Sequence, residues 1–280
     1  MWFGVRYMAK NAVKTEYTVS SEKLGSTLRI ALVADVHERV QDDIILLLKE
    51  SKPDLIAVAG DTFERFDNDN HLPCGRAKMN FLHRWFLYAA FSVNYFFIQV
   101  IGRKNHPKTE NSYKLLTQAS KIAPVFMSTG NHEEKFNDKD ISVFKENRIV
   151  ILDNSEASVT INGTPLHIGG LSTYCDEEWL NSFAKGGDFK LLLCHHPEYF
   201  DTLIEKKDID LILSGHNHGG QIRLFGKGLF SAGGGLFPKY SRGLYHDRLI
   251  VSAGCSNTAA LPRLGNPREL VIINLIPKKN

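Results

Sequence analysis

Five short stretches of the chain carry side chains that bind divalent metal ions. They combine carboxylates, imidazoles and a carboxamide, and they contain no cysteine. Such ligands suit borderline ions such as Mn, Fe, Zn or Co, whereas a structural zinc site would normally use thiolates. Two ions about 3.5–4 Å apart could clamp a phosphoryl group and acidify a water, so the chemistry indicated is hydrolysis of a phosphoric ester. In chain order the stretches are Asp35-Val36-His37, Gly60-Asp61, Gly130-Asn131-His132-Glu133, His195-His196 and Gly215-His216-Asn217-His218.

Each of these stretches follows a short apolar run, which predicts a buried strand. In open α/β sheets ligands bind at the carboxyl ends of the strands, so the five stretches are expected to meet at one edge. Residues two apart in extended chain point the same way. Asp35 and His37 can therefore share one ion, and His216 and His218 can face one cluster. The five runs are 28–34, 55–59, 125–128, 191–194 and 211–213.

Further strand and helix patterns alternate along the chain, which argues for α/β layers. A mixed sheet, or two packed sheets with outer helices, fits this order best. Residues 154–165, with Asn162-Gly163 as the turn, predict a hairpin, and the glycine-rich stretch 226–243 contains aromatic residues and predicts an ordered loop. We find no linker or internal repeat and expect one domain, 1–280. The other predicted strands are 150–152, 157–161, 166–169, 249–253 and 270–275, and the predicted helices are 42–50, 113–121, 141–147 and 197–206.

Taken singly, none of the five stretches is specific, because a Gly-Asp or Asn-His pair is more often a turn than a metal ligand. One alternative is a non-catalytic metal-binding scaffold, which would be expected to have lost ligands, and none is lost here. Another is a metallo-β-lactamase-like hydrolase, but the chain has no H-x-H-x-D-H block. The complete ordered set, with each member after an apolar run, favours an enzyme.

The ordered set resembles the calcineurin-like metallophosphoesterase family, whose pattern runs D-x-H, G-D, G-N-H-[DE], H and G-H-x-H. The resemblance covers about residues 28–275 and implies a four-layer α/β sandwich of two mixed β-sheets flanked by helices. It also implies metal-dependent hydrolysis with two divalent ions, and it places His132 beside the leaving-group oxygen as an acid or charge stabiliser. The implied ligands are Asp35, His37, Asp61 and His218 for the first ion and Asp61, Asn131, His195 and His216 for the second, with Asp61 bridging.

Segments after His218 resemble a bacterial subfamily of membrane-associated phosphodiesterases and UDP-2,3-diacylglucosamine pyrophosphatase-like enzymes. This narrower resemblance favours phosphodiester or pyrophosphate bonds in an amphiphilic or lipid-linked substrate. Arg223 and Arg263 are candidates for phosphate contact because they follow glycine-rich or site-adjacent loops. His196, the neighbour of His195, is a candidate for the rim of the site. The segments are Gly219-Gly220-Gln221-Ile222-Arg223, Leu236-Phe237-Pro238-Lys239-Tyr240, Gly243-Leu244-Tyr245 and Pro262-Arg263-Leu264-Gly265-Asn266-Pro267.

An insert of about 66–112 separates two of the metal stretches, since Asp61 and Asn131 are 70 positions apart (131 − 61). Its segment 81–101 is aromatic and apolar, and residues 85–101 carry no charge. Three interpretations remain: a buried helix, a helix that faces lipid or an acyl chain at a membrane surface, and a helix that spans a membrane. Basic residues on both sides suit an interface. We expect a hydrophobic helical insert, with peripheral membrane contact as a candidate role.

The composition is that of an ordinary globular protein, with a net charge of +3 from 34 basic and 31 acidic residues. That balance is too even to favour nucleic acid as a partner, and no protein partner is predicted. The four cysteines form no C-x-x-C pair, which favours free thiols in a reducing compartment. The first ten residues lack a signal peptide's apolar run. We therefore expect a cytoplasmic protein, with the cytoplasmic membrane face as an alternative location.

Overall fold

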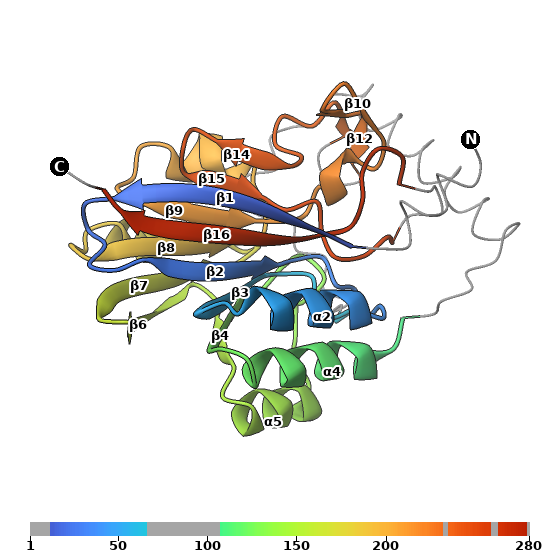
Figure 1. Cartoon of the computed structure of the whole chain (residues 1–280), viewed down its shortest axis with the longest axis horizontal. Helices are drawn as coiled ribbons and strands as arrows, with labels where there is room; N and C mark the ends of the chain where they lie inside the picture. The colour runs from blue at the N-terminus through green and yellow to red at the C-terminus, as the bar shows by residue number, and fades with distance from the viewer. Residues whose placement is uncertain (1–11, 66–106, 232–234, 259–262, 279–280) are drawn as a thin grey trace, which may run out of the picture.

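A computed structural model of the chain describes residues 12–65, 107–231, 235–258 and 263–278 (Figure 1). Two six-stranded mixed sheets form its centre. The first sheet has the strand order β1-β16-β2-β3-β4-β5, and all its neighbours are parallel except β16 and β2. Its strands are β1 (Val13–Ser21), β16 (Glu269–Pro277), β2 (Leu28–Val33), β3 (Leu55–Ala59), β4 (Val125–Ser128) and β5 (Val150–Leu152).

The second sheet has the order β14-β15-β9-β8-β7-β6, with parallel pairs at its centre and an antiparallel pair at each edge. The predicted hairpin forms its outer edge: Ile161 pairs with Thr164, and Asn162 and Gly163 both have positive φ, as the turn requires. The strands are β14 (Gly243–Tyr245), β15 (Leu249–Val251), β9 (Leu211–Ser214), β8 (Phe189–Cys194), β7 (Thr164–Leu171) and β6 (Ser155–Ile161).

Four layers result because the central strands bury both faces. In β2, Ile30 and Leu32 pack between the two sheets, whereas Ala31 and Val33 pack under the helices. Figure 1 shows α2 (Asp42–Ser51), α4 (Thr109–Ser120) and α5 (Asp138–Glu146) together on the outer side of the first sheet. The second sheet's outer face packs against α6 (Glu177–Phe183) and the π-helical turn η1 (Phe200–Ile204). The predicted α/β sandwich of two mixed sheets with outer helices is confirmed.

Short pairs of strands lie within and just before the predicted ordered loop 226–243, of which residues 232–234 lie outside the described part. The pairs lie beside the 3-10 turn η2 (His218–Gly220) that follows β9. They are β10 (Arg223–Leu224) with β11 (Lys227–Gly228), and β12 (Phe230–Ser231) with β13 (Gly235–Leu236).

The structure differs from the sequence prediction in two helical segments, one strand and one cysteine. The predicted helix 197–206 is only the short turn η1, and neither β1 nor α6 was expected. The expectation of free thiols holds for the buried Cys194 and Cys255 but is wrong for Cys175, which is disulfide-bonded. Sequence spacing could not show this, because the fold decides which cysteines meet.

Most of the predicted insert lies outside the described residues, including the whole of 81–101. Its last predicted residues, 109–112, form the start of α4. Within the described ranges, no helix is long and apolar enough to cross a membrane.

Candidate metal centre

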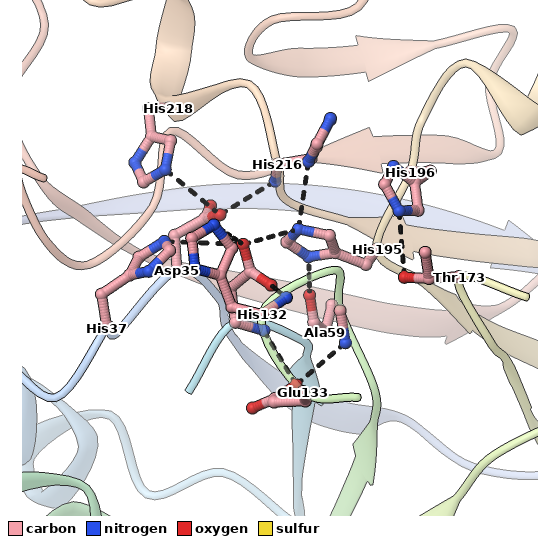
Figure 2. A network of polar contacts seen from close by, with 12 residues as sticks. Asp35, His37, Ala59, His132, Glu133, Thr173, His195, His196, His216 and His218 are labelled. Atoms are coloured by element: carbon pink, nitrogen blue, oxygen red, sulfur yellow. Dashed lines mark hydrogen bonds and ion pairs between the residues drawn. The ribbon is translucent and has the colours of Figure 1, made fainter. Parts of the chain in front are cut away.

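The predicted carboxylate and imidazole ligands meet at the carboxyl ends of strands from both sheets (Figure 2). Asp61 follows β3 and lies at the middle of the cluster. Its Oδ2 atom is 3.0 Å from His195 Nε2, 3.5 Å from His37 Nε2 and 3.9 Å from His132 Nε2. One carboxylate oxygen is thus shared between histidines of the first sheet and a histidine of the second.

Among the groups of candidate ligand atoms in the described residues, two consist only of predicted ligands, and the second of them includes Asp61. In the first, ligand atoms of Asp35, His37 and His218 lie within 4.8 Å of one another, and His218 Nε2 is 3.7 Å from Asp35 Oδ1. In the second, the same limit of 4.8 Å holds for Asp61, His195 and His216. The structure therefore brings the predicted carboxylates and imidazoles together in two adjacent sets.

Several donor atoms of the predicted ligands are buried and have no hydrogen-bond partner. They are Asp35 Oδ2, His37 Nε2 and Asn131 Oδ1. Buried polar groups are normally paired, so three unpaired acceptors in one site need an explanation. Carboxylate, imidazole and amide oxygen are also the donor types that borderline divalent ions accept. The residues present fit two such ions.

The backbone at this site adopts conformations that residues other than glycine rarely occupy. Each such residue costs of order 1–3 kcal/mol, so it persists only where the surrounding structure requires it. Here the strain turns successive side chains inward at the strand ends. The φ angles are 55° at Asp35, 49° at His37, 55° at Asp61, 73° at His216 and 45° at His218.

Glycines let the two sheets approach each other beside the ligands. A Cβ atom added at Gly60 would lie 2.7 Å from His195 Nδ1, and one at Gly215 would lie 2.8 Å from Asp35 Oδ2. At Gly130 the added atom would lie 2.6 Å from the backbone nitrogen of Asp61. Each glycine precedes a predicted ligand, as the sequence indicated.

We expect Gly130→Ala to displace Asp61 and to weaken metal binding. Overpacking of this kind typically costs about 1–3 kcal/mol, so the melting temperature should fall together with the ion content. Gly187→Ala is the control, because nothing lies within 4 Å of its added Cβ. Elemental analysis after gel filtration and a thermal melt measure both effects, and unchanged ion content in Gly130→Ala would contradict this account.

Glu64 contacts two histidines of the site and was not singled out from the sequence. Its Oε2 atom is 2.8 Å from His132 Nδ1 and its Oε1 atom is 3.0 Å from His37 Nδ1. Burial raises the pKa of Glu64, but the two histidines outweigh it and lower the pKa to about 2. Burial lowers the pKa of His132, but Asp61 and Glu64 outweigh it and raise the pKa to about 9. The contact with Glu64 holds the His132 ring with Nδ1 away from the cluster and Nε2 toward Asp61.

Glu133 holds the two loops of the centre together. Its carboxylate accepts hydrogen bonds from four backbone N–H groups: Asp61 at 3.1 Å, Thr62 at 2.7 Å, Phe63 at 3.0 Å and Gly130 at 2.9 Å. Burial and the charge of Asp61 raise its pKa to about 7, although the amide donors act in the opposite direction. The G-N-H-[DE] stretch contains this residue, but only the structure shows its partners.

The predicted substrate contacts lie close to the cluster but bind protein groups. His196 is buried, with Nε2 3.0 Å from Thr173 Oγ1 and Nδ1 3.3 Å from Glu198 Oε1 (Figure 2). Arg263 is also buried and donates to the carbonyl oxygen of Ala253 at 2.6 Å. Arg223 donates to the carbonyl oxygen of Gly219 at 2.9 Å and to Ser241 Oγ at 3.0 Å. Their contact with substrate stays a prediction.

The chain is similar to a known protein family over more than half of its length. The sequence matches the model of the calcineurin-like phosphoesterase family over residues 28–220. Protein YpbG of Bacillus subtilis is 26% identical over 275 residues, which cover 95% of this chain and 88% of YpbG. A Caenorhabditis elegans protein named as a metallophosphoesterase is 26% identical over 283 residues, 90% of this chain but 49% of that protein. The crystal structure of the calcineurin-like phosphoesterase YfkN of Bacillus subtilis aligns over 82% of both chains, at 14% identity and a TM-score of 0.42.

Proposed function

Because this chain belongs to the calcineurin-like phosphoesterase family, and so is a metal-dependent phosphoesterase, we propose that it hydrolyses phosphodiester or pyrophosphate bonds with two divalent ions. The preference for diesters and pyrophosphates is supported by the sequence segments after His218. The native ions are proposed from the donor types as Mn, Fe, Zn or Co.

The observation that carries the proposal is the position of Asp61 Oδ2 between His195 Nε2, at 3.0 Å, and His37 Nε2, at 3.5 Å. An oxygen so placed can bind two ions at once. We assign Asp61 as the bridge between them. The other proposed ligands are Asp35, His37 and His218 on one side, and Asn131, His195 and His216 on the other.

The protein's own groups would then act on the substrate in two ways. When bound, the ions neutralise charge on the phosphoryl oxygens and lower the pKa of an attacking water to about 7. His132 holds a proton on Nε2 and gives it to the leaving-group oxygen as the bond from that oxygen to phosphorus breaks. Glu64 fixes the orientation of His132 through Nδ1, at 2.8 Å.

Hydrolysis of bis-p-nitrophenyl phosphate tests the proposal. We expect the chelated protein to be inactive, and added Mn to restore the rate with a requirement for two ions per chain. A faster rate on the monoester p-nitrophenyl phosphate would remove the diester preference and leave the phosphoesterase assignment. Failure of all four metals on diester, monoester and pyrophosphate substrates would instead favour a non-catalytic scaffold.

Removing the carboxylate beside His132 should shift the pH dependence. Glu64 raises the pKa of His132, and a general acid loses its proton as pH rises through its pKa. In Glu64→Gln the alkaline limb of the kcat profile should therefore move to lower pH, by about one unit or more. An unshifted limb in a variant that still binds two ions would contradict the role of His132 as the acid.

We also infer an amphiphilic substrate and peripheral contact with the cytoplasmic membrane face, supported by the apolar sequence 81–101. Replacing residues 85–101 with a Gly/Ser linker of equal length should abolish sedimentation with anionic phospholipid vesicles. Hydrolysis of the small chromogenic diester should persist, because no proposed ligand lies in the segment. Vesicle binding that survives the replacement would contradict the membrane role.

A further inference from the structure

The histidines of the centre share a pattern in which one ring nitrogen faces the donor cluster and the other faces a protein group. His37 directs Nδ1 to Glu64 Oε1 at 3.0 Å, and His195 directs Nδ1 to the carbonyl oxygen of Ala59 at 2.8 Å. An oxygen in that position keeps a proton on the outer nitrogen. The inner nitrogen is then left with a free lone pair for a metal ion.

His216 presents Nδ1 to the cluster, 3.2 Å from His195 Nε2 (Figure 2). Its outer nitrogen, Nε2, lies 3.6 Å from Glu198 Oε1. That distance is longer than a hydrogen bond, and a small rotation of the Glu198 side chain would close it. Because the contact is to a carboxylate, it favours the Nε2–H form of His216.

We propose that Glu198 is a positioning residue that holds His216 with Nδ1 directed at the second ion. This inference rests on the two-ion function proposed above and names a residue outside the ligand set. Glu198 lies on the turn after β8, three residues beyond His195, and reaches across to His216 after β9. One turn would thus supply a ligand and also orient the ligand of the neighbouring strand.

The surroundings of Glu198 fit this role. His196 contacts the same Oε1 atom through Nδ1 at 3.3 Å, and its ring packs 4.3 Å from that of His216. Thr173 Oγ1 lies 3.0 Å from the far nitrogen of His196, so this ring is itself fixed. Glu198 Oε2 has no hydrogen-bond partner, which leaves the carboxylate free to turn toward His216.

His218 shows that a carboxylate is not a general feature of these ligands. Its Nδ1 lies 3.3 Å from the guanidinium Nη2 of Arg263, a cation. Carboxylate partners strengthen imidazole as a donor, and their loss typically lowers metal affinity about 10–100-fold. Because His216 is the proposed ligand that Glu198 contacts, the effect of Glu198 should be confined to the ion that His216 binds.

Chelator competition with Mn on the full-length chain tests the proposal, and no substrate is needed. Glu198→Ala should lower the affinity for one of the two ions about 10–100-fold and leave the other unchanged. Glu198→Gln should recover much of the loss, since its amide oxygen can still accept from His216 Nε2–H. The control is Glu156→Ala, because Glu156 lies 3.4 Å from His167 Nε2, far from the ligands in sequence and on edge strand β6.

The possible outcomes distinguish failure of the positioning role of Glu198 from failure of the two-ion function. Two ions bound with unchanged affinity in Glu198→Ala would overturn the positioning role and leave the two-ion function intact. Three ions in the wild type and two in Glu198→Ala would also overturn it, because Glu198 would then itself be a ligand with His196 and His216. A wild-type chain that binds fewer than two ions would overturn the proposed function and this inference together.

Discussion

Asp61→Asn is expected to reduce hydrolysis of a chromogenic diester by about 10³-fold or more. Metal ions contribute several kcal/mol to such reactions, and each 1.4 kcal/mol is about tenfold in rate. The variant replaces Oδ2, the atom 3.0 Å from His195 Nε2 and 3.5 Å from His37 Nε2, with an amide nitrogen that cannot bind a cation. It keeps Oδ1, which accepts a hydrogen bond from the His132 backbone N–H at 3.0 Å, so the loop should fold. The measurement is kcat/KM with saturating Mn.

Asp153→Asn is the matched control for this prediction. Asp153 follows β5 at the same end of the first sheet, and its Oδ1 atom lies 3.2 Å from Thr129 Oγ1. It belongs to none of the groups of candidate ligands. The control should keep the wild-type rate, and an Asp61→Asn variant that did the same would exclude the bridging role.

His132→Ala is expected to lower kcat about 10²–10⁴-fold, the usual contribution of a proton donor. The loss should be larger for an alkyl ester than for a p-nitrophenyl ester, because a poor leaving group depends more on protonation. Both ions should remain bound, since His132 is assigned outside the ligand set. Elemental analysis and kcat for the two esters provide the measurement.

Two other results for His132→Ala would have a different meaning. Equal losses for both esters would indicate charge stabilisation rather than proton transfer. Loss of an ion would show that His132 is a ligand. Ion content is measured for this reason, because His132 Nε2 lies 3.9 Å from Asp61 Oδ2.

The parts of the fold that sequence could predict are those where burial dictates residue type. The strands β3 and β4 begin and end where the apolar runs do, because these central strands bury both faces. β1 was missed because it alternates exposed and half-buried residues and only Val19 is buried. In place of the helix predicted at 197–206, the structure has the short π-helical turn η1. Its apolar residues pack on the outer face of the second sheet.

The candidate site could be predicted as far as the ligands follow strands directly. Asp35, Asp61 and His195 stand at strand ends, where topology alone brings them together. Glu64 and Glu198 could not be found in this way, since each lies beyond a strand end and its role depends on which histidine nitrogen it meets. Pairing of that kind is set by loop geometry and leaves no spacing pattern.

The most direct test of the two-ion centre is an anomalous diffraction map of crystals soaked in Mn. We expect two peaks about 3.5–4 Å apart with the Asp61 carboxylate between them. His37 and His218 should lie beside one peak, and His195 and His216 beside the other. A single peak bound by all four histidines would contradict the two-ion centre. So would the absence of any peak at this site in a crystal where Mn is fully bound elsewhere.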